Sequence, residues 1–193
     1  MQIATGTAPT LINAIWPRET GGVLRLALLA IVGSMLMAVS AKIQVPMWPV
    51  PMTMQTFAVL VIGMAYGAKL AGATLLLYLA EGAAGLPVFA SGAGLPYMAG
   101  PTGGYLVGFL VAAIMVGWLA ERGWDRNVAL TFLANLAGTA IIFALGVAWL
   151  STIMGGFEKA VVAGFQPFIV GAIVKIALAA AMLPLVWKLL PRR

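Results

Sequence analysis

Long apolar segments take up most of this chain and limit the folds open to it. Of its 193 residues, 63% are hydrophobic and 8% are charged, and the mean hydropathy is +1.06. A soluble domain carries about a quarter charged residues, whereas apolar segments of this kind are typical of bilayer spans. We therefore predict an all-α integral membrane protein with six transmembrane helices in one bundle. The expected spans are approximately 22–41, 54–66, 70–81, 104–120, 128–150 and 166–190.

The six spans leave little sequence for a second domain. We expect residues 1–193 to form a single transmembrane domain, in which residues 1–21 are a cytoplasmic or interfacial N-terminal tail. Basic residues predict the orientation, because they gather on the cytoplasmic side of membrane proteins. Eight flank one side of the expected bundle, whereas two, Lys42 and Lys159, flank the other, so both termini are expected in the cytoplasm. The eight are Arg18, Arg25, Lys69, Arg122, Arg126, Lys188, Arg192 and Arg193.

The composition argues against several function classes. Cysteine and histidine are absent, which removes disulfides, thiolate metal sites and imidazole catalysis. No GxxxxGK[ST] motif is present, so the sequence offers no phosphate-binding loop for ATP hydrolysis. The net charge is +6, but the basic residues are scattered, and nucleic acid is not an expected partner. We expect no enzymatic activity, no cofactor and no metal.

The connection between the third and fourth spans, residues 85–105, has an unusual composition. It contains no charged residue, and Pro87, Pro96 and Pro101 rule out a continuous helix. Irregular backbone at membrane depth is tolerated where protein buries it or where it lines a watery cavity. This long Gly/Pro-rich segment is therefore predicted to be the wall or lid of a ligand site rather than a plain connector. The connection 42–53, with three prolines of its own, is expected to be extended and to lie on the same external face.

Lys175 is the strongest single candidate for a functional residue, because it lies inside the sixth apolar segment. Such a lysine is costly in a membrane and usually faces an internal cavity and a partner. It can present a cation to an anionic or carbonyl-bearing ligand, extend along its stem toward the interface, or pair with Glu81. Glu81 in turn can accept from ligand N–H groups, pair with Lys175 or Lys42, or stay solvated at the mouth of the central connection.

Other polar and aromatic residues are weaker candidates. Asn135 forms a thin polar stripe with Thr131 and Thr139, a pattern that more often joins helices than binds a ligand. Tyr97 and Tyr105 can line an apolar pocket with hydroxyls at its rim, or lie at the membrane interface. A second pattern lies in the first span, where small residues at a four-residue spacing share one helical face and permit close packing, inside the bundle or against a partner. They are Ala30, Ser34 and Ala38.

Three motifs in order, at residues 50–57 (VPMTMQTF), 85–90 (GLPVFA) and 100–105 (GPTGGY), resemble the BioY family of biotin transporters. The resemblance runs from about residue 24 to the C-terminus. It implies a protein of the bacterial inner membrane that captures biotin with high affinity as the substrate-binding component of an energy-coupling factor (ECF) transporter. Its implied partners are a transmembrane coupling subunit, two cytoplasmic ATPase subunits and the lipid bilayer.

The resemblance also suggests which residues act. The substrate-binding candidates are Lys175, Glu81, Gln55, Thr53, Tyr97, Thr102, Gly103, Tyr105 and Asn135. The first helix of such proteins offers small residues to the coupling subunit, which implies a partner interface at Ala30, Ser34 and Ala38. The sixth helix of the family usually carries Pro-Gly-Asp-x-x-Lys. Here Gly171 and Lys175 are kept, while Val170 and Ala172 replace the Pro and the Asp. We hypothesise that Glu81 partly substitutes for that missing carboxylate.

Two other functions are consistent with the residues. The first is a stand-alone facilitator or secondary transporter for a small carboxylated solute, with Lys175 and Glu81 as a coupling pair. Inverted repeats with interrupted helices would favour it, and the sequence shows no convincing internal repeat. The second is a structural membrane scaffold, which would make no use of Lys175 or of the central connection.

Overall fold

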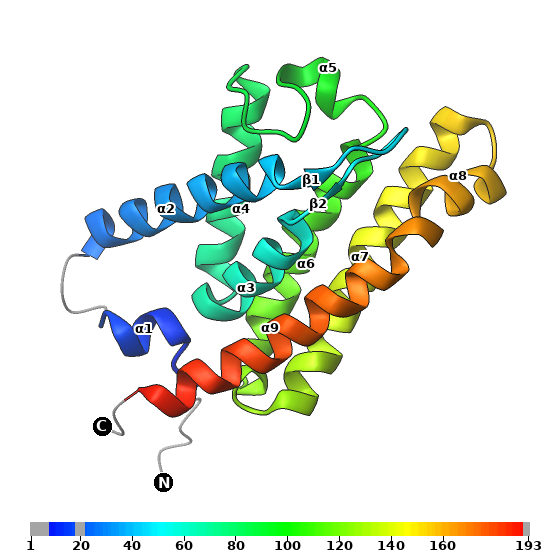
Figure 1. Ribbon diagram of the computed structural model, residues 1–193. Helices are drawn as coiled ribbons and strands as arrows, with labels where there is room; N and C mark the ends of the chain where they lie inside the picture. The colour runs from blue at the N-terminus through cyan, green and yellow to red at the C-terminus, as the bar shows by residue number, and fades with distance from the viewer. Residues whose placement is uncertain (1–7, 18–21, 191–193) are drawn as a thin grey trace, which may run out of the picture.

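Apolar helices dominate the computed structural model, which describes residues 8–17 and 22–190 (Figure 1). Four segments are long and apolar enough to cross a bilayer: Gly22–Lys42, Gly103–Ala120, Val128–Met154 and Phe157–Leu189. They contain the helices α2 (Gly22–Lys42), α6 (Gly103–Ala120), α7 (Val128–Met154), α8 (Phe157–Gly164) and α9 (Ile169–Leu189).

The two remaining expected spans are shorter helices, α3 (Gln55–Tyr66) and α4 (Ala68–Ala83). With 12 residues, α3 extends about 18 Å, well below the thickness of the hydrocarbon core. Helices therefore form at all six expected positions, but the count of six complete spans stays a prediction. Gly67 joins α3 to α4 with a φ of 80°, a left-handed conformation that favours glycine.

Helix α6 lies at the centre of the bundle and packs against α3, α4 and α7. Two glycines allow its close approach to α7. A Cβ at Gly104 would lie 2.4 Å from the Leu145 carbonyl oxygen, and one at Gly108 would lie 2.9 Å from the Ile142 Cα. Because neither position has room for a side chain, the backbones of α6 and α7 pack directly against each other there.

At one end of the bundle, the connection 42–53 folds over the helices as a short hairpin (Figure 1). Strands β1 (Gln44–Val45) and β2 (Met52–Thr53) pair antiparallel, with Gln44 opposite Thr53. The connection is thus extended, as its prolines predict, and the Trp48–Pro49 peptide bond is cis. The segment between α4 and α6 lies at the same end and is irregular except for the short helix α5 (Gly94–Met98).

The expected spans leave residues 151–165 as a loop between the fifth and the sixth, but most of these residues are helical. Helix α7 continues to Met154, and α8 forms after Gly155 and Gly156. Gly155, with a φ of 66°, ends α7, and the eight residues of α8 place the buried Ala160 and Gly164 on one face. The two glycines therefore mark a sharp turn between two helices rather than a longer loop. A short 3₁₀ helix, η2 (Gln166–Phe168), precedes α9.

The opposite end of the bundle is closed by α1 (Leu11–Ile15) and by the 3₁₀ helix η1 (Trp124–Arg126). Leu11 is buried in a cluster with Leu60 and Val116, and Arg126 donates to the Pro9 carbonyl oxygen at 3.1 Å. The described part of the N-terminal tail is thus packed on the bundle. The C-terminal part of α9 lies at this end too (Figure 1). Arg18, Arg192 and Arg193 lie outside the described residues.

Candidate ligand-binding pocket

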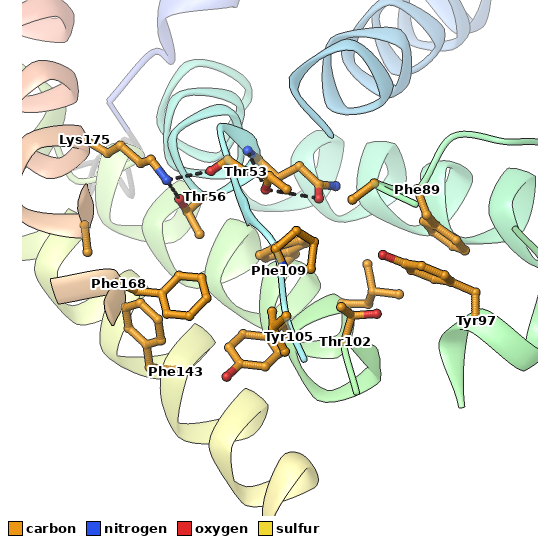
Figure 2. A pocket seen from close by; sticks show the side chains of 16 residues that line it. Thr53, Thr56, Phe89, Tyr97, Thr102, Tyr105, Phe109, Phe143, Phe168 and Lys175 are labelled. Atoms are coloured by element: carbon orange, nitrogen blue, oxygen red, sulfur yellow. Dashed lines mark hydrogen bonds between the residues drawn. The ribbon is translucent and has the colours of Figure 1, made fainter. Parts of the chain in front are cut away.

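A pocket with about 580 Å³ of atom-free space lies beneath the hairpin and the central connection. Its walls come from segments far apart in the sequence: the hairpin, α3, the central connection, α6, α7, η2 and α9 (Figure 2). Part of this space is open to the outside. The lining residues are Val50, Pro51, Thr53, Gln55, Thr56, Phe89, Ala90, Tyr97, Thr102, Tyr105, Leu106, Phe109, Phe143, Phe168, Ala172 and Lys175.

Lys175 projects from α9 toward the start of α3 (Figure 2). Its Nζ donates to the Thr53 carbonyl oxygen at 2.5 Å and to the Thr56 hydroxyl at 3.2 Å. An ammonium has three N–H donors, so one remains for another acceptor. Among the described lining residues, Lys175 alone carries a formal charge. The pocket therefore holds a cation whose charge its own walls do not neutralise.

Gln55 is held in one orientation by its neighbours. Its Nε2 donates to the Tyr78 hydroxyl at 2.7 Å, and that hydroxyl donates to the Val88 carbonyl oxygen at 3.1 Å. The Gln55 Oε1 accepts from the Thr53 hydroxyl at 3.3 Å. Since an amide nitrogen cannot accept a hydrogen bond, this chain of bonds fixes the carbonyl oxygen on the pocket side. Gln55 thus offers a fixed acceptor to a ligand N–H group.

Two stacked rings form one wall of the pocket. Phe89 and Tyr97 lie nearly parallel, 5.1 Å apart between ring centroids (Figure 2). The Phe89 ring packs against α4 where Gly82 lacks a side chain, because a Cβ there would lie 2.0 Å from the ring. Lys42 donates from Nζ to the Phe89 carbonyl oxygen at 2.6 Å. The central connection is therefore held over the pocket by its packing against α4 and by its hydrogen bond to the end of α2.

The opposite wall consists of aromatic rings from three other elements. Phe143 of α7 packs edge-on against Tyr105 and Phe168, with ring centroids 6.5 and 6.0 Å apart. The Tyr105 hydroxyl donates to the Gly164 carbonyl oxygen at 2.7 Å and is buried. Tyr105 therefore presents its ring, rather than its hydroxyl, to a ligand.

Six of the nine predicted substrate-binding residues meet in this pocket: Lys175, Gln55, Thr53, Tyr97, Thr102 and Tyr105. A seventh, Gly103, lies beside the pocket without lining it. A Cβ at Gly103 would lie 2.0 Å from the Met98 carbonyl oxygen, so this glycine lets α5 pack against the start of α6. Of the three alternatives given for Lys175, its bonds to Thr53 and Thr56 favour the one in which the ammonium faces the pocket.

The structure places Glu81 and Asn135 outside the pocket. A carboxylate oxygen of Glu81 accepts a hydrogen bond from the Ser34 hydroxyl of α2, so Glu81 faces away from Ala172 and Lys175. This placement gives no support to the hypothesis that Glu81 partly substitutes for the missing carboxylate near Ala172, which stays a prediction. Asn135 is fully buried among the helices, and its amide has no hydrogen-bond partner in the described part of the chain.

The small-residue face of α2 is turned toward this chain's own bundle. Ser34 is 1% exposed, and Ala38 packs against the main hydrophobic core. Ala30 is half-buried and lines a second cavity at the other end of α2. The residues on the outward face of α2, by contrast, are large and apolar, such as Met35 and Val39.

Several lining residues were not among the predicted site residues. Thr56 could have been identified from the sequence, since it is a polar residue next to Gln55 at the start of an apolar span. The phenylalanines of the pocket, Phe109, Phe143 and Phe168, could not, because their spacing is that of ordinary core residues. Ala172 lines the pocket one helical turn before Lys175, so the position where the family usually has an aspartate does face the site.

An apolar helical bundle with a pocket walled by aromatic rings and one ammonium defines a membrane protein that binds a small solute. A model of the BioY family matches residues 13–192. The chain belongs to the BioY family.

Relatives of known name agree with this assignment. The chain is 41% identical over 145 residues to the "Probable biotin transporter BioY" of Pyrococcus horikoshii, which covers 75% of this chain and 85% of that protein. It is 39% identical over 146 residues to the "Biotin transporter BioY" of Thermotoga maritima, with the same two shares of 75% and 85%. The fold matches a crystal structure of "the S-component for biotin from an ECF-type ABC transporter", with a TM-score of 0.75 and 20% identity, over 86% of this chain and 92% of that one.

Proposed function

We propose that this chain binds biotin and mediates its uptake as the substrate-binding component of an ECF-type transporter. The proposal is supported by the BioY family match and by the relatives named as biotin transporters. The observation that carries it is the free N–H of Lys175 in a pocket of aromatic rings and neutral polar groups. A pocket with these groups favours a ligand that is largely apolar but has strong hydrogen-bond acceptors.

Biotin has groups that match each part of this pocket. Its fused rings and aliphatic chain suit the aromatic walls formed by Phe89, Tyr97 and Phe143. Its carboxylate and its ureido carbonyl are both acceptors for the remaining N–H of Lys175. Its ureido N–H groups need acceptors, and the fixed Oε1 of Gln55 and the hydroxyl of Thr102 supply them. Because Ala172 brings no carboxylate, these neutral oxygens take over that part of the recognition.

Equilibrium binding to the purified chain in detergent tests this proposal. We expect tight binding of biotin and clearly weaker binding of desthiobiotin, which lacks the sulfur-containing ring that fills the apolar part of the pocket. Biotin amide, which has no carboxylate, shows which ligand oxygen Lys175 meets. If Lys175→Gln abolishes the preference for biotin over the amide, Lys175 binds the carboxylate. If the preference is unchanged while both affinities fall, it binds the ureido carbonyl. Absence of measurable biotin binding would overturn the proposal.

The partners of the chain follow from the same proposal. A transmembrane coupling subunit and two cytoplasmic ATPase subunits would supply the energy for uptake, and this chain itself would hydrolyse no ATP. Since Ser34 and Ala38 are directed into the bundle, we place the contact with the coupling subunit on the outward apolar face of α2, at residues such as Met35, Leu36 and Val39.

A stand-alone facilitator is the alternative, and transport in vesicles separates the two functions. Vesicles that contain this chain alone should bind labelled biotin without accumulating it in their lumen. Addition of the coupling and ATPase subunits with ATP should give accumulation. Accumulation by the chain alone, driven by an ion gradient, would favour the secondary transporter.

The proposed location is the bacterial inner membrane, with residues 1–193 as one transmembrane domain and both termini in the cytoplasm. The distribution of basic residues supports this orientation. It puts the hairpin, α5 and the pocket on the external side, where biotin arrives. Labelling of single cysteines introduced at Lys159 and at Lys188 in intact cells tests it. An impermeant reagent should modify the first position and not the second.

A further inference from the structure

A second cavity lies at the end of the bundle opposite the ligand pocket. It opens between the start of α2, the start of α4 and the C-terminal end of α3, and it encloses about 1520 Å³ of atom-free space, part of which is open to the outside. Gln55 at the first turn of α3 lines the ligand pocket, whereas Tyr66 at its last turn lines this second cavity. The two sites are therefore separated by the length of α3.

Arg25 supplies a buried cation to this cavity. Its side chain is 2% exposed, and one terminal nitrogen donates to the carbonyl oxygens of Ile12 and Trp16 and to the Asn13 side-chain oxygen, at 3.2, 2.5 and 3.1 Å. All three acceptors are neutral. The Arg25 Nε is buried without a hydrogen-bond partner among the described residues. A buried charge is costly without a counter-charge, and the described residues bond none to Arg25, so the site favours an added anion.

Lys69 adds a second, exposed cation to the lining, in the first turn of α4. The acidic residue that lines the same cavity is Glu121, and its Oε1 accepts from the Ala68 backbone N–H at 3.0 Å. This carboxylate is thus bonded to the start of α4. The described lining therefore carries two cations and one carboxylate, and both cations have donors free to bind an anion.

Apart from Asn13 and Tyr66, the remaining described lining is apolar or glycine, and it continues onto the membrane-facing side of α2. Val23 and Leu26 line it and are 83% and 44% exposed. Helix α2 is one of the segments able to cross a bilayer, so these side chains are placed to contact acyl chains. A small soluble anion would use the cations and leave this apolar part uncovered, whereas an amphiphile covers both.

We propose that this cavity binds an anionic phospholipid, with its phosphate at Arg25 and Lys69 and its acyl chains along Val23 and Leu26. Basic pockets between membrane helices are known sites for anionic head groups. The site is independent of biotin recognition, because it shares no lining residue with the ligand pocket.

Lipid retention by the purified chain tests this proposal. The chain is delipidated in a mild detergent, mixed with phosphatidylglycerol or phosphatidylcholine of the same acyl chains, and analysed by native mass spectrometry. We expect one phosphatidylglycerol to bind at least about tenfold more tightly than phosphatidylcholine, since a charge-assisted bond contributes strongly. Soluble glycerol phosphate, which has the head-group phosphate without acyl chains, should not compete at equal concentration.

Lys69→Gln is the main variant, because the exposed Lys69 can be replaced without loss of the fold. It should remove most of the preference for phosphatidylglycerol, while Lys159→Gln at the opposite end of the bundle should keep it. Both variants should bind biotin as the wild type does, which separates this test from that of the proposed function. Three results would each overturn the proposal. They are equal retention of the two lipids by the wild type, an unchanged preference for phosphatidylglycerol in Lys69→Gln, and full competition by glycerol phosphate.

Discussion

The Gln55 side-chain amide donates to the Tyr78 hydroxyl at 2.7 Å, and this contact links the ligand pocket to the inside of α4. Tyr78 is fully buried and is absent from the pocket lining. It therefore acts on a ligand through the lining residues that it holds, Gln55 by a hydrogen bond and Phe89 by an edge-on ring contact. Because the Tyr78 hydroxyl also donates to Val88, a single phenol joins α3 and α4 to the central connection.

Tyr78→Phe should weaken biotin binding by about three- to tenfold, the range expected for one net hydrogen bond. The variant frees the Gln55 amide to turn its nitrogen toward the pocket and to lose its role as an acceptor. Isothermal titration measures the change. Tyr66→Phe is the matched control, since its hydroxyl donates to the Leu29 carbonyl oxygen at the far end of α3. An affinity loss of equal size in both variants would contradict the orienting role of Tyr78.

Lys175→Ala should lower the affinity for biotin at least about tenfold, because it removes a charge-assisted hydrogen bond from an apolar site. The bonds from Nζ to Thr53 and Thr56 are lost as well, so thermal unfolding should be followed in parallel. Lys159→Ala, an exposed lysine of α8, should bind biotin like the wild type. Wild-type affinity in folded Lys175→Ala would remove the main support for the proposed site.

Glu81→Gln should leave biotin affinity within about twofold of the wild type, a change below 0.5 kcal/mol. The substituted side chain still has an oxygen that can accept from the Ser34 hydroxyl, and Glu81 does not line the pocket. The same titration measures this variant beside Lys175→Ala. A tenfold loss would mean that Glu81 turns toward the ligand on binding and would support its predicted role.

Gly82→Val should disturb the wall formed by Phe89 and Tyr97. A Cβ at this position meets the Phe89 ring at 2.0 Å, so a larger side chain must displace the ring and with it the stacked Tyr97. We expect a loss of biotin affinity of about tenfold or more with the helical content retained. The comparison variant is Gly72→Ala on the same helix, whose Cβ would meet only the Ile114 side chain of α6, at 3.1 Å.

The stability of the protein should depend on pH through Asp125. Burial raises the pKa of this carboxyl from 3.8 to about 6, against the opposing effects of the Trp187 hydrogen bond and the Arg126 charge. A raised pKa means that the folded protein keeps a proton that the unfolded chain releases between these two values. Stability should therefore fall as the pH rises from 4 to 6 and level off above 6, by at most about 3 kcal/mol.

Asp125→Asn keeps an oxygen that can accept from Trp187 and cannot ionise. Thermal unfolding in detergent between pH 4 and pH 7.5 should show a decrease for the wild type that this variant largely lacks. Parallel decreases in the two proteins would assign the pH dependence to other groups.

The helices and the central signals of the site could be predicted from the sequence. Helix α2 spans Gly22–Lys42 and ends one residue beyond its expected end. It could be predicted because the length and hydropathy of a segment are enough to identify a span. Lys175 was identifiable because a lysine in an apolar segment needs a structural or functional reason. The same logic missed Phe143 and Phe168. A phenylalanine on a buried helix face has the same pattern whether it contacts another helix or a ligand.

The direction of a side chain around its helix could not be predicted at the ends of the spans. Glu81 is near the central connection in sequence, yet its side chain reaches Ser34 on α2. The spacing of Ser34 permitted packing inside the bundle or against a partner, and the structure shows Ser34 1% exposed, inside the bundle. Helix α8 was missed because Gly155 and Gly156 predict that a helix ends. They do not predict the residue at which the next helix begins.

The Lys175 ammonium reaches the end of β2 from a position 122 residues later in the chain. One side chain thus joins the hairpin to the last helix. A ligand oxygen bound to Lys175 would share its ammonium with the Thr53 carbonyl oxygen of the hairpin. A ligand bound to Lys175 would therefore contact a group that also holds the hairpin and the first turn of α3 to α9.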